Sequence, residues 1–354
     1  MLQFFKNASF DWLADRRIFI AISILLMLAG LVSAVVRQAV PGGTDAFNLG
    51  VDFKGGTVVT VKFKQRPSAE VIRAAVNKQG LTDAVIQPAT DKQDEVLIKL
   101  PQIGQAASTE AETQSQVDIG RAKVREALNT FGPEAKDDLN SDAQAAYKIV
   151  GTDAVGPVAG RQLRNQAIAV TLAALVGILL YIAFRFEWTY GAAAVIAVFH
   201  DVLVTLGFFS IFQWEISLTV IAALLTLVGF SVNDTIVVFD RIRENLRLHR
   251  RDSLYKVTND SINQTLSRTI ITSGLVFLSV LAMVIFGGDV LRGFSLALLI
   301  GVAFGTYSSI AIASPIMVWW QQRLDAARVH TPPAKSGRAS ESAARTTKAK
   351  AAVL

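Results

Sequence analysis

Six long apolar stretches dominate the hydropathy pattern of this 354-residue chain, and each contains few charged residues. A helix needs about 20 consecutive apolar residues to cross the hydrocarbon core of a bilayer. We therefore predict a polytopic α-helical membrane protein. The six predicted transmembrane helices lie at residues 18–36, 166–184, 190–212, 216–239, 264–286 and 294–316.

Between the first two apolar stretches, residues 37–165 show short alternating patterns that predict a separate α+β domain. The predicted strands are 57–63 (TVVTVKF), 83–88 (DAVIQP), 95–100 (EVLIKL) and 146–150 (AYKIV). One helix is predicted at 68–79, and another from the capping box of Thr109 and Glu112 to about Phe131. The order βαββαβ is typical of a ferredoxin-like unit, an antiparallel sheet with helices on one face.

The composition supports a membrane protein, because 51% of the residues are hydrophobic, 18% are charged and the mean hydropathy is +0.40. The chain has no cysteine, which excludes thiolate metal sites, thiol catalysis and disulfides. It has three histidines, no glycine-rich phosphate loop and no nucleophile elbow. We therefore predict that the protein is not an enzyme and has no catalytic residues, no metal and no cofactor.

The net charge of +6 comes from lysines and arginines beside the ends of the apolar stretches and in the tail. This placement indicates contact with membrane lipids rather than with nucleic acid. Short cytoplasmic loops carry an excess of positive residues, which orients the chain. We predict a cytoplasmic N-terminus (1–17), a periplasmic domain (37–165), the transmembrane region 166–316 and a cytoplasmic, largely disordered basic tail (317–354).

Two charged residues lie inside predicted helices, where an unpaired charge is costly. Asp234 lies six residues before Asp240, about 9 Å from the cytoplasmic end of its helix, and Arg268 lies at a similar depth on the next helix. We expect the two side chains to pair, either as a structural lock or as a carboxylate on a proton path that gains a proton when Arg268 moves away. Supporting hydrogen bonds are expected from Asn233, Thr235 and Thr269.

A second polar pair, His200 and Asp201, falls near the middle of another predicted helix, with Asp201 about 16 Å deep. On its own, His200 is explained as a packed histidine bonded to a backbone carbonyl. Two acids, a histidine and an arginine in one small bundle exceed what structural locking requires. We therefore predict a proton path through Asp234, Arg268, Asp201 and His200.

Small residues in the last predicted helix indicate close helix packing. Gly301 and Gly305 have the spacing that lets two helices approach closely. The same role is predicted for Gly191, Gly207 and Gly229.

Several motifs together give the chain a family resemblance. They are GVDFKGGT (50–57), VGPVAGRQL (155–163), VFHDVLVTLG (198–207), GFSVNDTIVVFDRIREN (229–245), INQTLSRTIITS (262–273) and GTYSSIAIASP (305–315). With these motifs the chain resembles the SecF family of protein-export membrane subunits, within the resistance-nodulation-division superfamily. The resemblance covers nearly everything from the first apolar stretch to Pro315.

The resemblance implies a multi-pass protein of the bacterial cytoplasmic (inner) membrane that works with a SecD-like subunit. The pair would act beside the SecYEG channel and SecA, using the proton-motive force to draw preproteins across the membrane. It also implies that Asp234 and Arg268 take part in proton movement. Gly55 and Gly56 are expected to form a hinge into the periplasmic domain, and Asp52 a turn or cap.

Two other functions fit the same sequence. One is a half-sized proton-driven exporter of small molecules or lipids, although such exporters usually have twice as many helices and two large loops. The other is a non-transporting scaffold of the translocation machinery. The sequence leaves open whether protons or sodium ions are used, because a carboxylate serves either.

Overall fold

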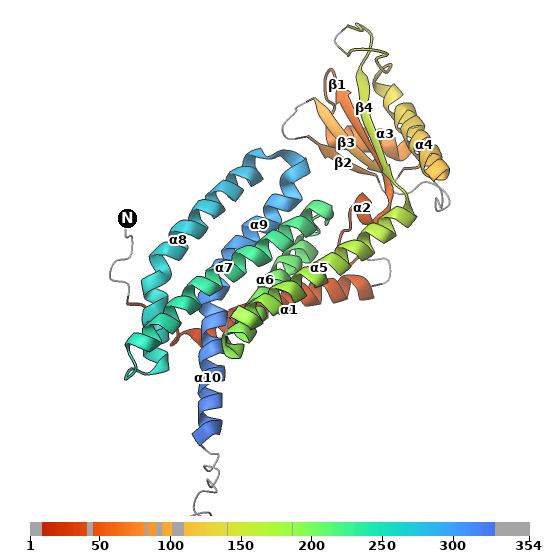
Figure 1. Ribbon diagram of the computed structural model, residues 1–354. Helices are drawn as coiled ribbons and strands as arrows, with labels where there is room; N and C mark the ends of the chain where they lie inside the picture. Colours follow the sequence, from red (N-terminus) through yellow and green to blue (C-terminus); the bar gives the residue numbers. More distant parts are fainter. Residues whose placement is uncertain are drawn as a thin grey trace, which may run out of the picture.

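Six membrane-length helical spans make up most of the described chain in the computed structural model, and a small sheet domain stands at one end of them (Figure 1). The structure describes residues 9–40, 45–81, 84–89, 94–100, 110–139, 141–185 and 187–329. The spans are α1 (Arg16–Ala39), α5 (Pro157–Arg185), α6 (Trp188–Phe212), α7 (Leu218–Leu248), α8 (Leu254–Phe286) and a sixth made of α9 (Gly288–Ser308), the π-helical turn η2 (Ser309–Ala313) and α10 (Ser314–Val329). All six predicted spans are confirmed. Residues 317–329, predicted as the start of a largely disordered tail, are helical and belong to α10, and the rest of the predicted tail lies outside the described residues.

The helix ends differ from the predicted ones where polar residues continue a helix. α7 runs on to Leu248 and α8 already begins at Leu254, whereas the apolar stretches end at 239 and begin at 264. Polar contacts between the two helices hold this extension together: Asn245 Nδ2 donates to Ser261 Oγ (2.8 Å) and to Gln264 Oε1 (2.9 Å). Hydropathy locates the membrane crossing, but side-chain pairing beyond the membrane decides where these helices end.

The sheet domain has the predicted order βαββαβ. Its elements are β1 (Gly56–Phe63), α3 (Ala69–Lys78), β2 (Val85–Pro88), β3 (Glu95–Leu100), α4 (Glu110–Leu128) and β4 (Tyr147–Val155), with the short helices α2 (Val51–Lys54) before β1 and η1 (Asn129–Phe131) after α4. The strands lie antiparallel in the order β2-β3-β1-β4. The predicted capping residue Thr109 lies outside the described residues.

Alternating residues give the sheet one buried face. Val59, Val61 and Phe63 of β1 point into a core with Ile98 of β3 and Ile72 of α3. α3 and α4 lie on this same side of the sheet (Figure 1). Side chains between these buried positions, such as Lys99, therefore point from the opposite face.

Glycines allow the closest helix crossings in the bundle. A Cβ atom on Gly30 of α1 would lie 2.5 Å from the Gly207 Cα of α6, and one on Gly301 of α9 would lie 2.5 Å from Leu227 Cδ1 of α7. These close approaches are consistent with the packing role predicted for Gly207 and Gly301. The same prediction is wrong for Gly229, because a Cβ there would meet nothing within 4 Å.

The segment before α1 lies along the beginning of α8. Trp12 donates from its backbone N to Asn259 Oδ1 (2.9 Å) and from Nε1 to Asn263 Oδ1 (3.1 Å). Both asparagines donate in return to the carbonyl oxygen of Phe10, each at 2.9 Å. Leu13 is fully buried beside these contacts. This N-terminal clasp, residues 10–13, ties the entry of α1 to a helix far away in the sequence.

Candidate functional site

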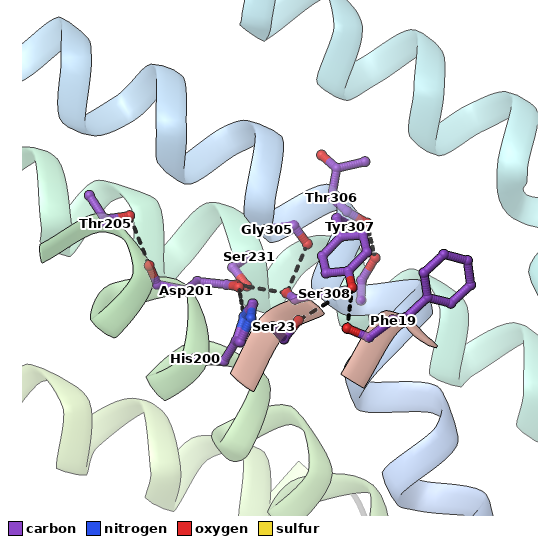
Figure 2. Close-up of polar contacts among 11 residues, drawn as sticks. Phe19, Ser23, His200, Asp201, Thr205, Ser231, Gly305, Thr306, Tyr307 and Ser308 are labelled. Carbon is purple, nitrogen blue, oxygen red and sulfur yellow. Dashed lines mark hydrogen bonds and ion pairs between the residues drawn. The ribbon is translucent and has the colours of Figure 1, made fainter. Parts of the chain in front are cut away.

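Asp201, on α6, lies fully buried at the meeting point of three helices (Figure 2). Its Oδ2 accepts hydrogen bonds from Ser231 Oγ of α7 (2.5 Å) and from Ser308 Oγ of α9 (2.8 Å). Its Oδ1 lies 2.9 Å from Nδ1 of His200. The carboxyl group is thus surrounded by groups that donate hydrogen bonds, in a place where an unsatisfied polar atom is expensive.

Gly305 explains how α9 comes close enough to supply Ser308. A Cβ atom on Gly305 would lie 3.3 Å from Ser231 Cβ, which is a tight contact, and 3.6 Å from Asp201 Oδ2, which is an ordinary van der Waals contact. This geometry is consistent with the packing role predicted for Gly305, and it places that packing beside Asp201. Directly after Ser308 the helix widens into η2, where Ser314 Oγ donates to the Ser309 carbonyl five residues back (3.0 Å). Single π-helical turns of this kind occur often at functional sites.

His200 is buried against Tyr307 as well as bonded to Asp201. The two ring centroids are 6.4 Å apart, and among the described residues Nε2 of His200 has no hydrogen-bond partner. Tyr307 donates from its hydroxyl to the Phe19 carbonyl (2.7 Å) and accepts from Ser23 Oγ (3.3 Å), as Figure 2 shows. His200 therefore contacts a carboxylate rather than the backbone carbonyl expected of a merely packed histidine.

Asp234, one turn after Ser231 on α7, is buried at a second polar contact. Its Oδ2 accepts a hydrogen bond from Ser273 Oγ of α8 (2.8 Å). α7 thus serves both acids: Ser231 bonds to Asp201, and three residues later Asp234 itself bonds to α8. Three residues of helix correspond to about 4.5 Å along the axis, so the two contacts are one turn apart on a single rigid element.

The predicted pair of Asp234 with Arg268 is not formed. No ion pair within 4.0 Å joins these two described residues, and the Arg268 side chain is exposed, although its charge still acts on Asp234 at longer range. The register of α8 explains this difference. Ser273 faces Asp234, and Arg268 lies five residues earlier, about 140° round the helix and about 7.5 Å along it.

The predicted supporting residues do not bond to Asp234 either. Asn233 is exposed, and the buried hydroxyls of Thr235 and Thr269 have no hydrogen-bond partner among the described residues. Serines bond to the two acids instead: Ser273 donates to Asp234, and Ser231 and Ser308 donate to Asp201. Of these, Ser231 was detectable as the residue one turn before Asp234, whereas Ser308 is brought in by tertiary structure alone.

At the base of the sheet domain, Gly55 and Gly56 adopt φ angles of 79° and 148°. A Cβ atom on Gly56 would also lie 2.4 Å from the Leu100 carbonyl oxygen, so glycine is required there. Asp52 accepts a hydrogen bond through Oδ2 from the backbone N of Leu218 (2.9 Å). Its predicted cap role is confirmed, but the capped helix is α7 rather than a local turn.

Within the described part of the chain, no group of three or more histidine, aspartate or glutamate residues is placed to hold a metal ion.

Comparison with known proteins agrees with this architecture. Residues 135–323 match the family model described as protein export membrane protein SecD/SecF, C-terminal, and residues 43–65 match the SecD/SecF GG motif. The protein translocase subunit SecF of Koribacter versatilis is 42% identical over 91% of this chain and 94% of its own length. The SecF of Escherichia coli O157:H7 is 41% identical over 81% of each chain.

A solved structure shows the same arrangement. The crystal structure of SecDF, a translocon-associated membrane protein from Thermus thermophilus, superposes with a TM-score of 0.71 at 35% identity. The match covers 89% of this chain and 39% of that one. The present chain therefore corresponds to less than half of the SecDF polypeptide.

Proposed function

The chain belongs to the SecD/SecF family of protein-export membrane proteins, and we propose that it uses the proton-motive force to promote preprotein translocation. It acts together with a SecD-like subunit. The SecDF relative supports such a partner, because this chain aligns with only 37% of that relative's length. The complex works beside the SecYEG channel and SecA. The chain contributes ion coupling to translocation rather than bond-making chemistry.

The observation that carries this proposal is the burial of two carboxyl groups, Asp201 and Asp234, inside one membrane bundle. Neither is within 4.0 Å of a lysine or arginine among the described residues. Intramembrane acids without such a partner are costly and are typical of ion pathways. A purely structural lock between helices would be expected to hold the acid and the arginine together.

Serine hydroxyls suit acids that change their protonation state. A hydroxyl both donates and accepts hydrogen bonds, so Ser231, Ser308 and Ser273 can satisfy either the carboxylate or the neutral acid. Approach of Arg268 to Asp234 stabilises the anion in one state of the cycle, and its withdrawal favours the neutral acid. The membrane potential supplies about 2.3 kcal/mol per elementary charge per 100 mV.

The proposed orientation places the sheet domain in the periplasm and both termini in the cytoplasm of a bacterial cell, with the protein in the inner membrane. The clustering of basic residues on the α7–α8 connection, at the end of α7 away from the sheet domain, supports this orientation. Gly55 and Gly56 form the hinge on which the domain moves. Both glycines have positive φ angles; Gly55 lies between α2 and β1, and Gly56 is the first residue of β1.

The first test measures export in membrane vesicles that contain the SecD-like partner, the channel and SecA. Asp234→Asn and Asp201→Asn should each abolish the stimulation of preprotein translocation by the proton-motive force, because a permanently neutral side chain cannot carry charge through the cycle. Asp240→Asn is the matched control, since Asp240 is an exposed acid six residues further along α7. Protein levels are compared by blot.

Each other function has its own outcome in this experiment. If both variants accumulate normally and keep the stimulation, the acids are structural and the scaffold function replaces the proposal. If wild type gives no stimulation but a deletion strain loses export of small molecules, the exporter function is correct. Exchanging the proton gradient for a sodium gradient identifies the coupling ion.

A further inference from the structure

The segment that leads from α1 into the sheet domain is pinned to the turn between α6 and α7. We name residues 45–54 the strap. Ile216 N donates to the Asn48 carbonyl (2.8 Å), and Gly50 N donates to the Ile216 carbonyl (2.9 Å). Asn48 Nδ2 also donates to the carbonyl of Gln213 (3.1 Å). The strap and the turn therefore move as one piece.

The turn is itself held in an unusual conformation. Gln213 has a φ angle of 54°, the left-handed region that disfavours a residue with a Cβ atom. Such a backbone persists where surrounding contacts determine it, and here Gln213 Nε2 donates to the Ser210 carbonyl (2.8 Å) while its own carbonyl accepts from the strap. The start of α7 is thus defined by contacts rather than by a flexible loop.

Asp52 connects the strap directly to the first residue of α7. The first amides of a helix have no partner within the helix, and the N-cap residue Ser217 makes no side-chain cap bond. Asp52 supplies the missing acceptor at Leu218 N (2.9 Å). Its negative charge also suits the positive end of the helix dipole.

Lys99 connects the sheet itself to the same turn. Its ammonium group lies 2.5 Å from Glu215 Oε2, and the two side chains are 18% and 28% exposed. Gly50 makes room for Glu215, because a Cβ atom on Gly50 would lie 2.6 Å from Glu215 Oε1. A cavity of about 510 Å³ lies beside this pair, lined by Lys99, Glu215 and the strap. The junction therefore combines specific polar contacts around a hollow with a buried apolar cluster that contains Phe53 of the strap and Ile216 of the turn.

α7 connects the turn to the buried acids. Ser231 lies 13 residues after Leu218, about 20 Å along one continuous helix. At that level α7 bonds to Asp201, and one turn later to Ser273. A displacement of the turn shifts both contacts together, since a packed helix moves as a rigid element.

We propose that Asp52 and the Lys99–Glu215 pair form a latch that couples the position of the sheet domain to α7 and, through it, to the two buried acids. The inference rests on the proposed function and adds the contacts by which movement of the sheet domain reaches the buried acids. Asp52, Lys99 and Glu215 are positioning residues, because none of them touches the acids.

The test is a charge reversal in the same vesicle assay. Lys99→Glu and Glu215→Lys should each lose the stimulation by the proton-motive force while translocation driven by SecA alone continues. The double variant Lys99→Glu/Glu215→Lys should regain stimulation, because the pair is restored with reversed polarity. Lys62→Glu is the matched control: Lys62 forms an ion pair with Asp94 (3.1 Å) in the same sheet.

The outcomes separate the latch from the function on which it rests. If Asp234→Asn loses stimulation but both single reversals keep it, the latch is wrong and the proposed function stands. If the single reversals lose stimulation and the double variant does not recover it, the Lys99–Glu215 ion pair is not the cause of the loss, and the latch is again wrong. Should a reversal fail to accumulate, Lys99→Gln and Glu215→Gln provide the same comparison without repulsion. If wild type itself shows no stimulation, the proposed function fails first.

Discussion

Single residues decide the chemistry of this protein, and their roles depend on direction as well as depth. Asp234 and Arg268 lie on helices joined by one connection, which is why the sequence predicts an ion pair. A similar depth in the membrane is not sufficient for two side chains to pair, because residues five positions apart on a helix point in different directions. Ser273 lies on the face of α8 that meets Asp234, and Arg268 does not.

In the sheet domain, Tyr147 offers a test by pH. Its buried hydroxyl lies 3.1 Å from the Arg125 carbonyl and 3.0 Å from Asn129 Oδ1, and these two acceptors share its single proton. Burial and the nearby Glu134 carboxylate raise the pKa of Tyr147 from 10.0 to about 12, against the opposing charge of Arg125. The fold therefore favours the neutral phenol. This contribution to the free energy of unfolding is complete below about pH 10 and is lost as the pH rises towards about 12.

The measurement is thermal unfolding of the full chain in detergent between about pH 8 and pH 12. Tyr147→Phe should remove this alkaline loss and lower stability at neutral pH by about 1–2 kcal/mol, since the donor shared by two buried acceptors disappears. Tyr181→Phe, at an exposed tyrosine, is the control. An unchanged alkaline profile in Tyr147→Phe would contradict the assignment.

At the scale of elements, the crossing of α1 and α6 depends on the absence of side chains. The Cβ atom of an alanine at position 30 would lie 2.5 Å from the Gly207 Cα. That atom belongs to the backbone and cannot rotate away. We expect Gly30→Ala to destabilise the bundle by about 1–3 kcal/mol through overpacking, measured as a lower midpoint of thermal unfolding.

Gly229→Ala provides the matched control for this prediction. Position 229 is also a glycine within a membrane-length helix, but it is exposed, and an added Cβ would meet nothing within 4 Å. Its midpoint should stay close to that of wild type. Equal effects of the two substitutions would show that helix propensity, not the crossing, sets the cost.

At the scale of the whole molecule, two ties link elements that are distant in sequence. On the sheet side the strap joins the domain to α7. At the other end the N-terminal clasp joins α1 to α8 through Trp12, Asn259 and Asn263. Since α8 carries Ser273, the two ties hold the helices on either side of the Asp234 contact.

The clasp can be tested by removing its amides. Asn259→Ala/Asn263→Ala eliminates four hydrogen bonds, each worth about 0.5–1.5 kcal/mol. We expect a net loss of about 2–4 kcal/mol and faster proteolysis of the segment around Trp12. Asn77→Ala, an exposed substitution in the sheet domain, should change neither. Normal stability of the double variant would show that the buried side chain of Leu13 holds the segment without the amides.

The sequence alone determined the six spans, the βαββαβ order and the presence of two intramembrane acids. These features follow from local rules, since apolar length and alternation depend on residues that are neighbours in the chain. It also indicated close packing for Gly301 and Gly305 and a turn or cap role for Asp52.

Tertiary structure decided which groups those residues meet. Ser308 reaches Asp201 from 107 positions away, and Asp52 caps a helix 166 positions later. The rotation of α8 gives Asp234 a serine in place of the predicted arginine. Such partners depend on the relative rotation and translation of whole helices. Many weak packing contacts together determine these rotations and translations, and no short stretch of sequence encodes them.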